Sequence, residues 1–150
     1  MKTLLIPLKS LFVFTLCFAF LVSCAKLEPD PVGTIILKMR NYDNGRTYLY
    51  PSGFNPSAYF IILADNNFSG YNIEFVSIGT VGGLGNVTSV PTSGWSYKVA
   101  VKPGHGYVAR CTYDGEYVYA RIYVVSWTEA ASSGGIIGAE IKYQSPFYPK

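Results

Sequence analysis

The 150-residue chain carries 12 basic and 9 acidic side chains, and 49% of its residues are hydrophobic. Two of the basic residues, Lys2 and Lys9, lie at the extreme N-terminus, so the remainder of the chain is close to neutral. A near-neutral domain creates no long-range field that gathers nucleic acid, and we therefore exclude nucleic acid as a partner. A domain of this size buries about two thirds of its unfolded surface, which is enough for one core without disulfides.

The first 23 residues have the layout of a secretory signal peptide. A short basic start precedes the apolar run 11–22, which is too short for a membrane span of about twenty residues but suits a signal sequence. The run ends in Leu21-Val22-Ser23-Cys24, which resembles the lipobox of bacterial lipoproteins. This resemblance implies that Ser23 is the last residue removed and that Cys24 carries the lipid. An ordinary signal peptide with a chance cysteine is the alternative.

A lipid on Cys24 would attach the protein to a membrane without a protein span, because several acyl chains anchor stably where one binds only marginally. The stretch that follows contains two prolines and two acidic residues, which is typical of a short extended tether. We therefore divide the chain into a signal peptide (1–23), a lipidated cysteine with its tether (24–32) and one domain (33–150). Ala25 favours the outer membrane over inner-membrane retention, and the acidic tether resembles the export signals of surface lipoproteins.

From residue 33 onward, short runs rich in Val, Ile, Tyr, Phe and Thr alternate with turns rich in Gly, Pro and Asn. Their spacing is typical of a sandwich or a barrel, and no amphipathic helix of useful length interrupts it. We predict an all-β fold, an antiparallel β-sandwich of about eight strands, with a small β-barrel as the alternative. The predicted strands are 34–40, 46–50, 58–64, 71–79, 96–102, 106–113, 116–127 and 138–144.

Two turns are specific enough to predict strand register. Asn44-Gly45 and Asp114-Gly115 tolerate a positive φ at both positions, as two-residue type I′ hairpins require. The second turn places Tyr113 opposite Glu116, and since side chains alternate along strands, this hairpin presents two different surfaces. One surface is small and apolar and carries Ala109, Cys111, Val118, Ala120, Ile122 and Val124. The other is aromatic and basic and carries Arg110, Thr112, Tyr117, Tyr119, Arg121 and Tyr123.

The single histidine of the chain and the last of its three cysteines lie together in PGHGYVARC, residues 103–111. Cys111 falls on the apolar surface, where a thiol packs as a small hydrophobic group and lacks the access that a nucleophile needs. It also has no disulfide partner, since Cys17 would be removed and Cys24 lipidated. His105 is flanked by glycines and is expected in an exposed loop. A contact to a ligand and a role as catalytic base are the two alternatives for His105.

The aromatic surface of the hairpin is the strongest candidate for binding. Tyrosines interleaved with arginines can stack on, and hydrogen-bond to, a carbohydrate or a protein. Tyrosine is also an ordinary strand residue, so another element of the sandwich could cover this surface instead. The candidate ligand-binding residues are Arg110, Tyr117, Tyr119, Arg121, Tyr123 and His105.

No pattern in the sequence indicates catalysis. The acidic residues are scattered singly, and no motif selects the carboxylate pair that a glycosidase needs. Asp65-Asn66-Asn67 lacks the downstream acid of a calcium loop, and one histidine cannot hold a transition metal alone. The glycine-rich stretch 79–94 contains neither a dinucleotide fingerprint nor a P-loop and is predicted to be a long loop. We therefore expect no metal site, no cofactor and no enzymatic activity.

A family resemblance extends over most of residues 33 to 147. It is carried by NNFSG (66–70), GLGNVTSVPTSGW (83–95), KVAVKPGHGYVAR (98–110), YARIYVV (119–125) and GGIIGAEIKYQSPF (134–147). With the lipobox, these stretches resemble a family of small Bacteroidetes lipoproteins that is known only as a domain of unknown function. The resemblance implies an all-β domain in the cell envelope, but no activity, cofactor or site residue.

These observations lead to one expected function and two alternatives. We expect a membrane-anchored, non-catalytic envelope lipoprotein, in the outer membrane, that binds a glycan or a protein partner. A structural subunit that completes an envelope complex through its edge strands is the first alternative. A hydrolase with an unrecognised site is the second.

Replacing Cys24 with Ala tests the predicted anchor. Without the thiol no thioether to a diacylglyceryl group can form, so we expect loss of palmitate incorporation and release of the protein from the membrane fraction. Metabolic labelling and fractionation of expressing cells measure both effects. Cys17→Ala, which changes a cysteine inside the apolar run, is the matched control and should retain the label. Continued labelling of Cys24→Ala would contradict the lipobox assignment.

Overall fold

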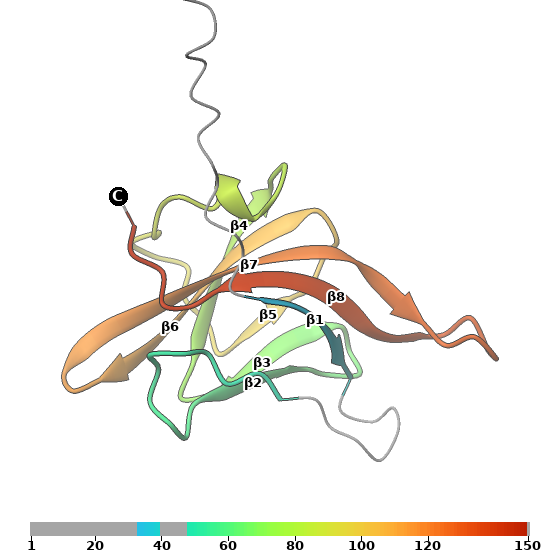
Figure 1. Cartoon of the computed structure of the whole chain (residues 1–150), viewed down its shortest axis with the longest axis horizontal. Coiled ribbons are helices and arrows are strands. Elements are labelled where there is room, and N and C mark those ends of the chain that lie inside the picture. Colours follow the sequence, from blue (N-terminus) through green and yellow to red (C-terminus); the bar gives the residue numbers. More distant parts are fainter. Residues whose placement is uncertain (1–32, 40–47, 150) are drawn as a thin grey trace, which may run out of the picture. The chain divides into compact units, whose positions relative to one another are not determined.

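The computed structural model describes residues 33–39 and 48–149, which form two antiparallel β-sheets (Figure 1). The larger sheet has the strand order β1-β8-β7-β6-β4, and the smaller has the order β2-β3-β5. The strands are β1 (Gly33–Lys38), β2 (Tyr59–Ile62), β3 (Asn67–Tyr71), β4 (Glu74–Thr80), β5 (Lys98–Ala100), β6 (His105–Tyr113), β7 (Glu116–Glu129) and β8 (Ile136–Gln144). The prediction of an all-β sandwich is confirmed, and the strands do not close into one continuous sheet.

Several sequence predictions concern residues that the structure does not describe. The signal peptide with Ser23, the lipidation site Cys24 and the turn at Asn44-Gly45 all lie outside the described residues. Among the residues that are described, no helix is both long enough and apolar enough to cross a membrane.

The region 66–80 differs from the prediction. One strand was predicted over 71–79, but Asn72 adopts a left-handed backbone with φ of 56°, and this turn divides the segment. Tyr71 therefore ends β3 in the smaller sheet, while β4 belongs to the larger one. The predicted strand 46–50 is reduced, in its described part, to one bridge between Leu49 and Phe60.

The register of the β6–β7 hairpin is confirmed. Asp114 and Gly115 have φ of 51° and 84°, as a type I′ turn requires. Tyr113 pairs with Glu116, and the pairing continues without interruption to Gly106 and Tyr123. The apolar surface of this hairpin therefore faces one way along its whole length, and the aromatic surface faces the other.

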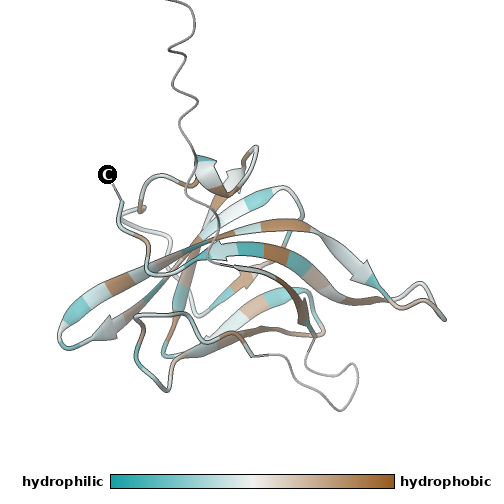
Figure 2. Ribbon diagram, viewed as in Figure 1, coloured by the Kyte–Doolittle hydropathy of each residue, from teal (hydrophilic) through white to brown (hydrophobic). Residues whose placement is uncertain are grey.

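The main core lies between the two sheets. The apolar surface of the hairpin, including Ala109 and Ile122, packs in the same cluster as Phe60, Phe68 and Phe75, and these side chains are buried. The alternation of hydrophobic and hydrophilic residues along the long strands that produces this packing is visible in Figure 2.

The hydroxyl of Tyr107 joins the two sheets inside the core. It donates a hydrogen bond of 2.8 Å to the carbonyl of Ala100 and accepts one of 2.9 Å from the backbone N–H of Lys102. Burial raises the pKa of this hydroxyl, so it remains a donor at neutral pH.

A second, smaller cluster covers part of the outer surface of the larger sheet. It contains Val76 and Val108 from the sheet, Val87 from the segment after β4, and Phe147 from the C-terminal segment. The segment after β4 includes the short 3₁₀ helix Leu84–Asn86. All the buried residues of both clusters belong to the sequence range 37–147. The domain therefore contains its own core.

Gly138→Ala should destabilise the domain. A Cβ at Gly138 would lie against the backbone of Leu37 and Lys38 on the neighbouring strand β1, and backbone cannot yield as a side chain can. We expect a loss of about 1–3 kcal/mol in the free energy of unfolding, measured by urea denaturation of residues 25–150.

Gly83→Ala is the matched control for this substitution. Gly83 has an extended backbone with φ of 163°, and no atom lies within 4 Å of the position that its Cβ would take. Its effect should stay within about 0.5 kcal/mol. Equal stabilities of the two variants would show that β1 does not pack against Gly138 as described.

Candidate functional site

The aromatic surface of the hairpin is divided into a covered part and an open part. Arg121 lies in the covered part and is only 7% exposed, so its predicted place on an exposed binding surface is wrong. Its Nε donates to Oε1 of Gln144 at 2.8 Å, and its Nη1 donates to the carbonyl of Val87 at 3.0 Å. The segment after β4 and the C-terminal segment with Phe147 cover it, and these bonds stabilise the buried charge.

Three further candidates differ in their exposure. Tyr123 and Tyr119 are half-buried, whereas Tyr117, nearest the turn, is 53% exposed. The surface therefore opens toward the Asp114-Gly115 end of the hairpin. Among these three tyrosines, the one at that end offers the most surface to a ligand.

His105 is not in the predicted exposed loop. It is the first residue of β6, is half-buried, and pairs with Thr80 of β4, whose Oγ1 lies 3.4 Å from the His105 Nε2. The strand continues for five residues from His105 to Arg110, which separates them by about 16 Å at the usual strand rise. His105 therefore does not belong to the site around Arg110.

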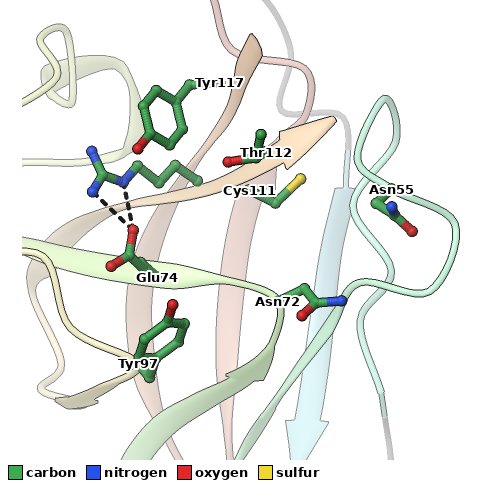
Figure 3. A pocket seen from close by; sticks show the side chains of 8 residues that line it. Asn55, Asn72, Glu74, Tyr97, Cys111, Thr112 and Tyr117 are labelled. Atoms are coloured by element: carbon green, nitrogen blue, oxygen red, sulfur yellow. Dashed lines mark hydrogen bonds and ion pairs between the residues drawn. The ribbon is translucent and has the colours of Figure 1, made fainter. Parts of the chain in front are cut away.

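An open cleft of about 200 Å³ lies at the turn end of the hairpin (Figure 3). Strands β4, β6 and β7 and three connecting segments contribute to it. In Figure 3, Glu74 lies between Tyr117 and Tyr97, and Asn55 and Asn72 lie toward the other end of the cleft. The residues that line it are Asn55, Asn72, Glu74, Tyr97, Arg110, Cys111, Thr112 and Tyr117.

A cross-strand ion pair forms the charged part of the cleft. Glu74 of β4 and Arg110 of β6 are directly opposite in the antiparallel register. The Nε and Nη2 atoms of Arg110 each lie 2.8 Å from Oε2 of Glu74. The two side chains are 18% and 26% exposed, so water screens their attraction less than it screens a surface pair. The pair carries no net charge, and Oε1 is the second acceptor of the carboxylate.

Two aromatic rings fix the Arg110 guanidinium. Its Cζ lies 4.1 Å from the ring centroid of Trp95 and 4.4 Å from that of Tyr117. Trp95 is itself held by a 3.1 Å hydrogen bond from its Nε1 to the carbonyl of Pro91, and it packs against the second hydrophobic cluster. Cation–π contacts and the ion pair therefore position Arg110 before any ligand arrives.

The remaining lining residues suit binding by stacking and hydrogen bonding. Tyr97 and Tyr117 are 63% and 53% exposed, so each leaves much of its surface open to a ligand. Asn55, Asn72 and Thr112 add neutral donors and acceptors. Within the described parts of the chain, no group of three His, Cys, Asp or Glu residues is arranged as metal ligands would be.

Only part of this site was predicted from the sequence. Arg110 and Tyr117 were named, and the structure brings them together. Glu74, Tyr97 and the two asparagines were missed because they reach the cleft from β4 and from loops. Glu74 did have a signal, since it is the only acid in the predicted strand 71–79, whereas nothing in the local sequence marks Tyr97.

Cys111 lies where the cleft meets the core. It is 3% exposed, which confirms its predicted core position. Burial raises the pKa of its thiol, and a hydrogen bond from the backbone of Asn55 offsets only part of that effect. The raised pKa lowers the fraction of reactive thiolate at neutral pH.

Cys111 should therefore react slowly with Ellman's reagent. In residues 25–150 it is the only cysteine, so the colour change reports on this thiol alone. We expect the folded domain to react at least about ten times more slowly than the urea-unfolded domain at the same pH. Equal rates would show that the thiol is accessible and ionised in the folded state.

Comparisons with known proteins gave one match. Neither the curated proteins nor the solved structures contained a protein similar enough to count as a match. A family model described as a domain of unknown function, DUF5036, matches residues 36–148, which include every strand that lines the cleft. The chain therefore belongs to the DUF5036 family.

Proposed function

We propose that the protein is a non-catalytic lipoprotein of the bacterial cell envelope, of the kind found in Bacteroidetes, that binds a glycan in the Arg110 cleft. The proposed anchor is a lipid on Cys24, in the outer membrane, supported by the lipobox-like sequence at 21–24. The proposed activity is binding, supported by the stacked arginine and the two exposed tyrosines of the cleft.

The observation that carries the proposal is that exposed aromatic rings and polar side chains line the same cleft. Sugar rings present a C–H face that packs on aromatic rings and an edge of hydroxyls that needs donors and acceptors. Tyr97 and Tyr117 supply exposed rings, while Arg110, Glu74 and Thr112 supply polar groups between and beside them. Because Arg110 is already held in place, a ligand would not need to order it.

Size and charge favour a neutral sugar over other small ligands. A volume of about 200 Å³ is below the roughly 300–1,000 Å³ of pockets that enclose drug-sized molecules. It suits one or two sugar rings in an open cleft. The Arg110–Glu74 pair cancels its own charge, so the cleft has no net charge that would select an acidic sugar.

Replacing the exposed tyrosines tests the proposal. Glycan-array and thermal-shift screens of residues 25–150 should identify a neutral glycan that binds saturably. Tyr117→Ala and Tyr97→Ala should each weaken binding about five- to ten-fold, the loss expected of one stacking contact. Titration calorimetry measures the change.

Tyr148→Ala is the matched control, since Tyr148 is 79% exposed and does not line the cleft. Urea denaturation of each variant separates a loss of binding from a loss of folding. Unchanged affinity in Tyr117→Ala and Tyr97→Ala would contradict the cleft as the site. A protein partner that co-purifies with the full chain, without any glycan binding, would favour an assembly subunit instead.

A further inference from the structure

Four tyrosines that the sequence did not mark form a connected cluster, the tyrosine patch, made of Tyr48, Tyr50, Tyr59 and Tyr71. Tyr59 of β2 is directly opposite Tyr71 of β3 in the antiparallel register. Tyr48 and Tyr50 flank Leu49, which pairs with the buried Phe60. Since side chains alternate along a strand, the tyrosines lie on the outer surface of the smaller sheet while Leu49 and Phe60 face the core.

The rings of the tyrosine patch support one another. The Tyr59 ring centroid lies 4.8 Å from that of Tyr48, 5.6 Å from that of Tyr50 and 5.9 Å from that of Tyr71. The planes of Tyr59 and Tyr71 differ by only 19°. Tyr50 and Tyr71 are nevertheless 58% and 55% exposed, so the patch offers pre-ordered aromatic surface to a partner.

The chemistry of the described tyrosines suits a neutral partner. The side chains of the patch itself are neutral phenols. Among the described residues, Lys98 of β5 forms an ion pair with Asp65 in the turn between β2 and β3, so these two charges offset each other. The patch therefore matches the Arg110 cleft, which is also neutral overall.

The tyrosine patch is connected to the Arg110 cleft at two places along the chain. Tyr71 immediately precedes Asn72, which lines the cleft, and consecutive Cα atoms are about 3.8 Å apart. Asn55, which also lines the cleft, lies in the loop that joins Tyr50 to Tyr59. The chain thus links the patch to the asparagine end of the cleft, at the edge where it crosses from β3 of the smaller sheet to β4 of the larger one. A ligand that contacts both must pass around this edge.

We infer that the ligand is a neutral glycan chain of several sugar residues, which lies across the tyrosine patch and enters the Arg110 cleft at its asparagine end. This inference rests on the proposed function and adds the length of the ligand and a second contact surface for it. The cleft alone would accommodate one or two sugars, whereas the patch supplies further stacking surface beside it.

Calorimetry of residues 25–150 with oligosaccharides of increasing length tests the inference. The probes are cello-, malto-, manno- and xylo-oligosaccharides, each from disaccharide to hexasaccharide. For at least one series, affinity should rise with chain length. Tyr71→Ala and Tyr50→Ala should weaken hexasaccharide binding about five- to ten-fold and leave disaccharide binding unchanged. Tyr117→Ala should weaken both, and Tyr148→Ala neither.

The outcomes distinguish this inference from the function on which it rests. Binding that is independent of length and unaffected by Tyr71→Ala would overturn the inference and leave the cleft as a short-glycan site. Absence of binding by every probe would overturn the inference, and the wider glycan array then decides the proposed function separately. Urea denaturation confirms that each variant is folded, which exposed tyrosines should permit.

Discussion

The turn at Asp114-Gly115 is the constraint on which the rest of the structure depends. Because side chains alternate with a period of two, a shift of one residue in the β6–β7 pairing would exchange the two surfaces. The positive φ at both turn residues prevents that shift. Cys111 and Ile122 consequently face the core, while Arg110 and Tyr117 face away from it.

Arg110 and Arg121 share that second surface but have different environments. Arg121 is covered by Val87 and Phe147 and is satisfied by hydrogen bonds inside the protein. Arg110 lies nearer the turn, between the rings of Trp95 and Tyr117, and it lines the open cleft. Trp95 packs against the second hydrophobic cluster and also contacts Arg110. The covered part of the surface therefore helps to position a residue of the open part.

The sequence predicted what is local and missed what depends on contacts between distant segments. The hairpin register follows from two adjacent residues and was predicted correctly. Arg121 was wrongly expected to be exposed because the residues that cover it, Val87 and Phe147, are far from it in the sequence. The strand β3, with its Asn, Ser and Gly, has weak strand propensity and is stabilised by pairing with β2 and β5.

The tyrosine patch was missed for a related reason. Its members come from three separate segments, and a tyrosine in a strand has no local mark that tells an outer position from a core one. Tyr107 illustrates this, since it is fully buried and hydrogen-bonded within the core. Only the register of β2 with β3, which places Tyr59 opposite Tyr71, shows that these rings lie together.

Neutral, mostly aromatic surfaces bind sugars by many weak contacts rather than by one strong one. The Arg110–Glu74 pair is already satisfied, so the stacking on Tyr97 and Tyr117 would supply most of the energy of binding in the cleft. Such contacts gain affinity when they are multiplied along a chain, and again when many copies share one surface. A lipid anchor on Cys24, as proposed, would hold many copies on one membrane and so convert modest individual affinities into firm attachment to a polymer.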